Sequence, residues 1–138
     1  MMHFEYKIVG GDFNLAGKPS SEVKKILKRL GVDSKVIKRT VIALYEAEVN
    51  VVAHAKSGTI KVDIEPEVIK VVLEDEGPGI PDIPLAMTKG FSTASKAVRE
   101  MGFGAGMGLP NIKENVDVFN ISSEVGKGTR LELINYIK

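Results

Sequence analysis

The sequence contains no cysteine, which excludes disulfide bonds and zinc sites built from thiolates. No apolar run approaches the roughly 18 residues that a membrane-spanning helix needs. The formal net charge is only +1 at pH 7, so we expect neither nucleic acid nor a membrane surface as a partner. The opening stretch MMHFEYKIVGGD has no basic region followed by an apolar one, so no secretory signal peptide is expected.

The overall composition is that of an ordinary soluble globular protein, with 43% hydrophobic and 27% charged residues. A length of 138 residues suits one domain, which we expect to span residues 1–138. The lack of cysteine is compatible with a reducing compartment, and together with the lack of targeting segments it favours a cytoplasmic location.

Two familiar phosphate-binding loops are also missing. The P-loop pattern GxxxxGK[ST] does not occur. The stretch MGFGAGMGLP, residues 101–110, places glycine at every second position from Gly102 to Gly108. It fails the dinucleotide fingerprint GxGxxG, because Met107 occupies the place of the third glycine. Such a run suits neither a strand nor a helix, since each glycine costs backbone entropy and adds no packing.

Hydrophobic periodicity predicts where the regular elements lie. Alternating apolar residues predict strands over residues 4–10, 59–65, 68–76, 118–124 and 129–137. Helical spacing predicts a helix over residues 20–31 with a serine cap, a long one from Asp33 or Ser34 to near Gly58, and a short one over 110–119. The segment from Gly77 to Gly108 is rich in glycine and proline, and we expect a long functional loop there.

The order of these elements predicts an α+β fold. Helices come in blocks, and the strands on either side of the turn Pro66-Glu67 read as an antiparallel hairpin. We therefore expect a two-layer α/β sandwich whose mixed, mainly antiparallel sheet is covered by helices on one face. A doubly wound parallel sheet is not expected.

The long predicted helix carries polar residues that are suited to chemistry. Glu46, Asn50 and His54 follow one another at four-residue spacing and so share one stripe of the helix. The small residues Ala43 and Ala47 are expected to leave room over that stripe, and Ile37, Val41, Leu44 and Val52 to form the core stripe. A carboxylate can accept a hydroxyl proton, and a carboxamide oxygen can ligate Mg²⁺. Taken alone, the pair Glu46 and Asn50 also fits a solvated helix face.

Three glycine-containing segments complete the pattern. LEDEGPGI ends a strand with Asp75, and the following Gly-Pro-Gly turn brings backbone close to whatever lies above the strand end. The glycines before Pro110 leave backbone N–H groups free to wrap an anion at the start of a helix, although they also fit a hinge. The stretch GKGTR leads into a strand at Thr129 and also fits an ordinary hairpin.

In this order the four segments resemble the N, G1 and G2 boxes and the terminal threonine of the GHKL (Bergerat-fold) ATPases. The resemblance covers about residues 36–135. Within that superfamily, the segments EAEVNVVAHA, FSTA, GMGLPNIKENVD and GKGT look like those of the bacterial anti-sigma-factor serine kinases and their switch-kinase relatives.

The resemblance implies an ATP- and Mg²⁺-dependent serine/threonine protein kinase of the anti-sigma-factor type, which phosphorylates a small STAS-type antagonist protein in a partner-switching pathway. It implies Glu46 as the general base, Asn50 as the Mg²⁺ ligand, and Asp75, assisted by Thr129, as the acceptor of the adenine amine. The further nucleotide-binding residues that it implies are Gly77, Gly79, Gly104, Gly106, Met107, Gly108 and Leu109.

Some points stay open at this level. Anti-sigma-factor kinases tend to place an arginine beside the G2 glycines, whereas Gly104 stands there in this sequence, so Arg99, Lys89 and Lys96 compete for the γ-phosphate. His54 fits either a phosphate contact or a packed helix end. The alternative function is a non-catalytic ATP-binding regulatory module that sequesters a sigma factor or another partner. A homodimer is also open.

Overall fold

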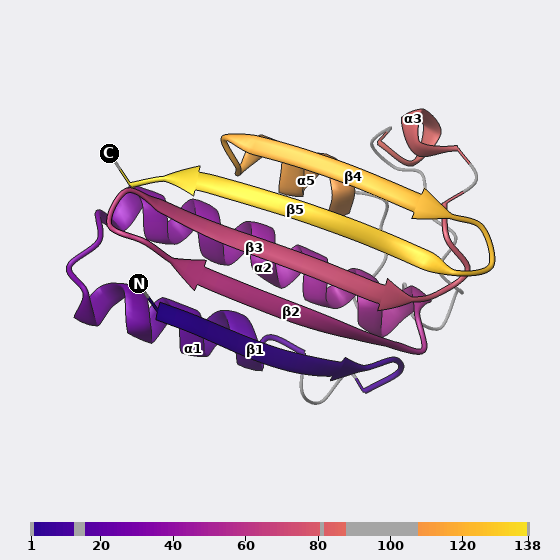
Figure 1. Cartoon of the computed structure of the whole chain (residues 1–138), viewed down its shortest axis with the longest axis horizontal. Helices are drawn as coiled ribbons and strands as arrows, with labels where there is room; N and C mark the ends of the chain where they lie inside the picture. Colours follow the sequence, from indigo (N-terminus) through magenta and orange to yellow (C-terminus); the bar gives the residue numbers. More distant parts are fainter. Residues whose placement is uncertain (1, 13–15, 81, 88–107, 138) are drawn as a thin grey trace.

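The computed structural model describes residues 2–12, 16–80, 82–87 and 108–137 (Figure 1). These residues form one five-stranded sheet with the order β1-β2-β3-β5-β4, and each of its neighbouring pairs is antiparallel. The strands are β1 (Met2–Val9), β2 (Ser57–Ile64), β3 (Val68–Glu76), β4 (Val118–Glu124) and β5 (Gly128–Tyr136). The helices are α1 (Lys18–Arg29), α2 (Ser34–His54), α3 (Ile83–Ala86) and α5 (Gly108–Glu114).

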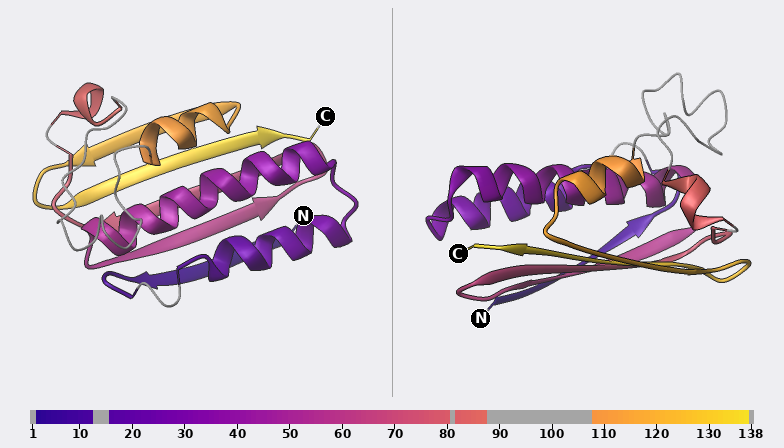
Figure 2. Two further views of the ribbon diagram at one scale, coloured as in Figure 1. Left: turned by 180° about the vertical axis from the view of Figure 1, so that it is seen from behind. Right: turned by 90° about the horizontal axis from the view of Figure 1, so that it is seen from above.

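The helices α1, α2 and α5 lie together on one face of the sheet, as the view from above shows (Figure 2). This arrangement confirms the predicted two-layer sandwich. The one-turn helix α3 lies within the segment that the sequence predicts as a long loop, and Asp82 caps it by accepting a hydrogen bond from the backbone N–H of Leu85 at 3.0 Å. Among the described strands no parallel pair occurs. The last strand, β5, runs antiparallel to both of its neighbours, β3 and β4.

The core lies between α2 and the sheet. Alternation along β2 and β3 points every second side chain at the helices, and these side chains are fully or almost fully buried: Ile60, Val62, Ile64, Ile69, Val71 and Leu73. Val23 and Leu27 of α1 and Leu44 and Val51 of α2 pack against them and are 0% exposed. Each such side chain contributes about 1.5–3 kcal/mol through its removal from water.

The stripe predicted on α2 is confirmed in part. Ile37, Leu44 and Val52 are buried, and Val41 packs against the core while staying partly exposed. Ala43 and Ala47 are 1% and 0% exposed, so the expectation that they leave open space over the polar stripe is wrong. Both alanines lie in the core, because α2 is covered by the sheet beneath it and by α1 and α5 on its flanks (Figure 2).

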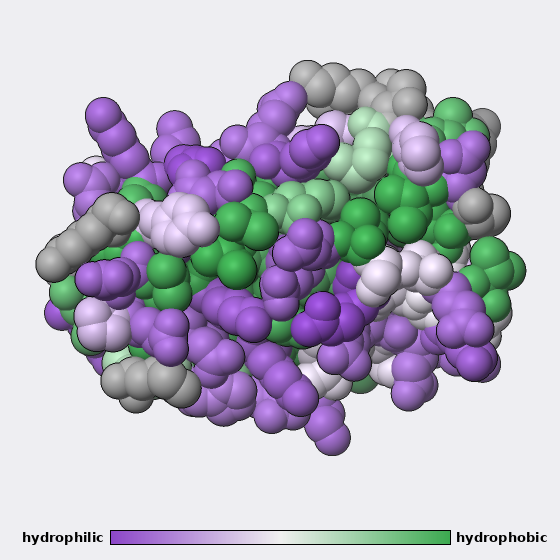
Figure 3. Space-filling view, turned by 45° about the horizontal axis from the view of Figure 1, so that its top comes forward, coloured by the Kyte–Doolittle hydropathy of each residue, from purple (hydrophilic) through white to green (hydrophobic). Residues whose placement is uncertain are grey.

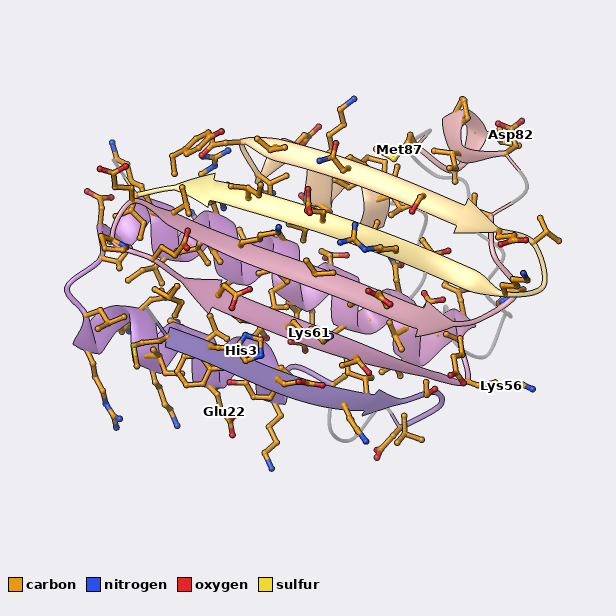
Figure 4. All side chains as sticks on the ribbon, in the orientation of Figure 1. His3, Glu22, Lys56, Lys61, Asp82 and Met87 are labelled. Carbon is orange, nitrogen blue, oxygen red and sulfur yellow. The ribbon has the colours of Figure 1, made fainter. Side chains whose placement is uncertain are left out.

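The uncovered face of the sheet is hydrophilic. Its strands carry ion pairs, including Lys70 with Glu132 at 3.3 Å and Arg130 with Glu74 at 3.6 Å, and His3 Nδ1 lies 2.6 Å from Asp63 Oδ1. In an oblique view of the molecule, hydrophilic side chains surround a band of hydrophobic ones (Figure 3), and His3 and Lys61 lie over β1 and β2 (Figure 4). Such exposed pairs contribute at most about 1 kcal/mol each, so this face is adapted to water and adds little to folding.

The two long helices begin in different ways. Asp33 caps α2 as predicted, because its Oδ1 accepts a hydrogen bond from the backbone N–H of Lys35 at 2.8 Å. The serine cap predicted for α1 is wrong. That helix starts at Lys18, after Gly17 with its φ of 93°, and Ser20 already lies in its first turn.

The start of α1 is instead capped from α2. Glu48 is 1% exposed, and its two carboxylate oxygens accept hydrogen bonds from the backbone N–H of Gly17 at 2.8 Å and of Ser20 at 2.7 Å. A carboxylate at this place satisfies N–H groups that have no partner within the helix, and it faces the positive end of the helix dipole. Glu48 therefore fastens α1 to α2.

Burial raises the pKa of Glu48 to about 7, although its hydrogen bonds from Gly17 and Ser20 act in the opposite direction. Nearby, burial and then the charges of Glu22 and Glu48 raise the pKa of Tyr6 on β1. A carboxyl group with this raised pKa holds its proton more tightly in the folded state than in the unfolded state. Folding stability must then fall as pH rises from the unfolded pKa toward 7.

We predict that Glu48→Gln removes this pH dependence. The variant stays uncharged at all pH values, so the free energy of unfolding of the wild type should fall relative to the variant by roughly 3 kcal/mol between about pH 4.5 and 7.5. Urea unfolding of both proteins across this range measures the difference. Glu65→Gln, at an exposed loop position, keeps Glu48 and is the matched control. Identical pH slopes for the wild type and Glu48→Gln would contradict the prediction.

Candidate functional site

The polar stripe of α2 faces the beginning of α5. Glu46 and Asn50 are both half-buried and lie one helical turn apart. Glu46 Oε1 lies 3.5 Å from Asn111 Nδ2, which donates to it. A Cβ atom added to Gly108 would lie 2.9 Å from Asn50 Oδ1, so α5 begins in close contact with the side chain of Asn50. The structure thus brings Glu46, Asn50 and Gly108 together.

A chain of asparagines anchors α5 in this position. Asn115 Nδ2 donates to the backbone oxygen of Asn111 at 2.8 Å and lies 3.2 Å from its Oδ1. Asn135 of β5 is 3% exposed, and its Nδ2 donates to the backbone oxygen of Asn115 at 3.1 Å and to Thr40 Oγ1 at 3.0 Å. Asn135 could not be identified from the sequence, because its partners Thr40 and Asn115 lie far from it along the chain.

Asp75 and Thr129 meet at the end of the sheet. Each lies two residues from a buried leucine on its strand, so both side chains are on the face that the helices cover. The backbone N–H of Thr129 donates to Asp75 Oδ1 at 3.0 Å. Burial raises the pKa of Asp75, and hydrogen bonds from the backbone N–H groups of Thr129 and Gly77 counteract the rise. An ionised carboxylate has about four lone-pair positions, so Asp75 can accept a further hydrogen bond beside those from Thr129 and Gly77.

The Gly-Pro-Gly turn after β3 packs tightly on its neighbours. A Cβ atom on Gly77 would lie 3.1 Å from the Cβ of Ala55, just beyond the end of α2. Gly79 has a φ of 75°, and a Cβ atom there would collide with the backbone carbonyl of Glu124 at the end of β4. The backbone N–H of Gly126 donates to the carbonyl of Pro78 at 2.9 Å. The turn after β3 and the β4–β5 turn therefore form one unit.

Ser123 is a central residue of this unit that the sequence analysis misses. Its hydroxyl oxygen accepts from the backbone N–H of Ile80 at 2.7 Å, donates to the carbonyl of Gly128 at 3.0 Å and lies 2.9 Å from Thr129 Oγ1. Its alternation with Ile121 along β4 and its pairing with Thr129 in the strand register place it on the covered face. A register prediction for the last hairpin would have found it.

Two more of the residues singled out in the sequence are described, and six others lie outside the described residues. Leu109 packs against the core, and His54 is half-buried at the end of α2, where burial lowers its pKa. The predictions that fall outside the described residues are those for Gly104, Gly106, Met107, Arg99, Lys89 and Lys96.

The described residues offer limited protein ligands for a metal. Among them, no group of three or more histidine, aspartate or glutamate side chains could hold an ion. The carboxamide oxygen of Asn50 is a hard donor beside Gly108, and Mg²⁺ commonly takes one or two protein oxygens and completes its shell with phosphates and water. Asn50 therefore fits a Mg²⁺ that arrives with a phosphate ligand.

A hollow of about 280 Å³ opens on the uncovered face of the sheet, and Asp75 is among the residues that line it. Its borders include Glu5, Glu74 and Glu76, with Lys61 as the basic residue among those that line it. The acidic side chains would repel a polyphosphate. Also within the described part of the chain, none of the helices has the length and apolar character needed to cross a membrane.

Comparison with known proteins identifies relatives of this chain. Residues 35–136 match the family described as "Histidine kinase-, DNA gyrase B-, and HSP90-like ATPase". The chain is 33% identical over 119 residues to "Serine/threonine-protein kinase RsbT" of Bacillus subtilis (strain 168), covering 83% of this chain and 84% of that protein. It is 32% identical over 104 residues to "Anti-sigma F factor" of Thermoanaerobacter sp. (strain X514), covering 75% of this chain and 65% of that protein.

A solved structure agrees at the level of the fold. The "Mycobacterial sensor histidine kinase MprB" superimposes with a TM-score of 0.54 at 18% sequence identity, covering 98% of this chain and 97% of the other. At this identity the likeness supports the architecture alone.

We predict that alanine at Gly79 destabilises the fold more than alanine at Gly126. Both glycines have a positive φ, 75° and 81°, so both substitutions introduce backbone strain of roughly 1–2 kcal/mol. Gly126 has open space around it, whereas the new methyl group at Gly79 meets the backbone of Glu124 and Val125. We expect Gly79→Ala to cost about 1–3 kcal/mol more, as measured by urea unfolding. Equal losses would mean that the two turns do not pack as described.

Proposed function

This chain belongs to the histidine kinase-, DNA gyrase B- and HSP90-like (GHKL) ATPase family, and we propose that it transfers the γ-phosphate of Mg-ATP to a serine or threonine of a STAS-type antagonist protein. Within the family it is a serine/threonine protein kinase of the anti-sigma-factor type, as its named relatives indicate. Two observations carry the proposal: Glu46, Asn50 and Gly108 converge at the start of α5, and Asp75 and Thr129 meet at the end of the sheet.

The sheet end binds the base in this proposal. Asp75 offers a carboxylate oxygen to the exocyclic amine of adenine, and Thr129 lies beside it as a second acceptor. Gly77 and Gly79 keep the backbone close around them, because side chains at these positions would meet Ala55 and Glu124. A charge-assisted hydrogen bond in a half-buried place is stronger than a neutral one, so Asp75 anchors the base.

The stripe of α2 binds the phosphates and carries out the transfer. The carboxamide oxygen of Asn50 ligates Mg²⁺, which when bound neutralises charge on the phosphate oxygens. Glu46 takes the proton of the incoming serine or threonine hydroxyl. The hydroxyl oxygen bonds to the γ-phosphorus, the bond between that phosphorus and the β–γ bridging oxygen breaks, and ADP leaves with the electron pair. Glu46 is half-buried, so part of its side chain is open to solvent among the described residues.

We propose that this kinase acts in the cytoplasm, where its nucleotide substrate ATP is available. The name of the anti-sigma F relatives favours a second function for this chain, the ATP-dependent binding of a sigma factor. The two functions differ in whether phosphate reaches the partner.

We predict that Asp75→Asn weakens ADP binding by about 10- to 100-fold. The variant can still accept a hydrogen bond from Thr129 through its carbonyl oxygen, but it then presents an NH₂ group to the amine of adenine and loses the charge-assisted bond. Calorimetry with ADP measures the change. Glu74→Gln is the matched control, because Glu74 precedes Asp75 on the same strand and points to the uncovered face. Undiminished ADP affinity in Asp75→Asn would refute the base assignment.

We further predict that Glu46→Gln and Asn50→Ala have different effects. Glu46→Gln removes a general base and keeps the hydrogen bond from Asn111, so Mg-ATP affinity should be nearly unchanged while phosphate transfer falls roughly 10²- to 10⁴-fold. Asn50→Ala removes a metal ligand, so Mg²⁺-dependent ATP affinity should itself fall.

The measurement pairs nucleotide affinity with incorporation of labelled phosphate into a STAS-domain protein encoded beside this one. Equal incorporation by the wild type and Glu46→Gln would remove Glu46 as the base. Tight ATP binding without incorporation into any such partner would favour the sigma-factor-binding function.

A further inference from the structure

The hydroxyl of Ser123 has three partners and one proton. The backbone N–H of Ile80 can only donate, so it takes a lone pair of Ser123 Oγ at 2.7 Å. The carbonyl of Gly128 can only accept, so it takes the single Ser123 proton at 3.0 Å. Ser123 then has no proton left for Thr129, so in the contact of 2.9 Å between their hydroxyl oxygens Thr129 is the donor and Ser123 the acceptor.

This arrangement fixes the polarity of Thr129. Its one hydroxyl proton points at Ser123, so its oxygen can offer only lone pairs to a ligand. The neighbouring Asp75 carboxylate is also an acceptor, and its Oδ1 is already held by the backbone N–H of Thr129. The sheet end therefore presents acceptors to a ligand and requires a ligand that donates.

We infer that Ser123 is a positioning residue that makes this site select adenine over 6-oxopurines. It acts through Thr129, and the inference rests on the proposed binding of the base at Asp75. Adenine carries an amino donor at C6, whereas hypoxanthine and guanine carry a carbonyl acceptor there. An acceptor placed against Asp75 and a fixed Thr129 leaves buried polar groups unpaired, which is the strongest way for a site to reject an analogue.

Removal of the Ser123 hydroxyl would release this constraint. Thr129 could then rotate its proton toward the ligand and donate to a carbonyl at C6. The two turns would stay together without Ser123, because the hydrogen bond from Gly126 to Pro78 at 2.9 Å and the packing of Gly79 against Glu124 do not involve it. Ser123→Ala is therefore expected to fold.

The test measures dissociation constants of ADP and inosine diphosphate by calorimetry and takes their ratio as the base selectivity. We expect the wild type to favour ADP, and Ser123→Ala to lose at least about tenfold of that selectivity, which corresponds to about 1.4 kcal/mol. Ser123→Thr keeps the hydroxyl and should keep the base selectivity of the wild type. Ser122→Ala is the matched control, because Ser122 is exposed and points to the other face of β4.

Thr129→Val tests the same contact between Ser123 and Thr129, and it leaves the hydrogen bond from the backbone N–H of Ile80 to Ser123 in place. It should also lower the selectivity, and the double variant with Ser123→Ala should lose no more than Thr129→Val alone, since both changes remove one interaction. This variant keeps the inference testable should Ser123→Ala not fold.

The remaining outcomes distinguish a failure of the inference about Ser123 from a failure of the proposed function. A Ser123→Ala protein that binds both nucleotides more weakly at an unchanged ratio would overturn the inference and leave Ser123 as a structural residue. Additive losses in the double variant would overturn it too. A wild type that binds ADP and inosine diphosphate equally would refute the base assignment at Asp75, and one that binds neither would refute the proposed function.

Discussion

Helix α2 packs against the sheet, α1 and α5 at the same time, and the rest of the structure depends on how its circumference is divided among them. Leu44 and Val51 face the sheet, Glu48 holds the start of α1, and Glu46 and Asn50 face the start of α5. Only a narrow strip is left for a ligand. The spacing of four residues between Glu46 and Asn50 is the way to keep two polar side chains on such a strip.

Much of the fold could be predicted because the relevant signals are local. The alternation in β2 and β3 is enforced by burial on one face, and the Asp33 cap acts on a backbone N–H two residues away. The α1 cap could not be predicted in this way, because Glu48 is 28 residues from Ser20 and lies on another helix. A serine at the start of a helical pattern is a strong local signal, but here the tertiary partner takes the role.

The candidate site shows the same contrast between local sequence signals and contacts that are distant in the sequence. Asp75, Thr129, Gly77 and Gly79 could be proposed as site residues from the sequence, because glycine-rich backbone and a strand-end carboxylate leave a visible pattern. Ser123 leaves no such pattern, since serine is common in strands and its role depends on the register that pairs it with Thr129. The same holds for Asn135, which is recognisable only once its contacts with Thr40 and Asn115 are known. Sequence motifs predict where the backbone is expected to approach a ligand closely. They are poor predictors of the side chains that hold the motif in place.

The two halves of the site rest on different supports. The half proposed to bind the base is built from two turns and two strand ends, and its geometry is set mainly by backbone atoms and by the Ser123 hydroxyl. The half proposed to bind the phosphates lies between α2 and α5, and its geometry depends on the asparagine contacts that hold α5 against β5 and α2. The halves meet where Gly77 contacts Ala55, just after α2 ends. Among the described residues, the two proposed halves rest on different contacts, so we expect a change on one support to disturb the other mainly where Gly77 meets Ala55.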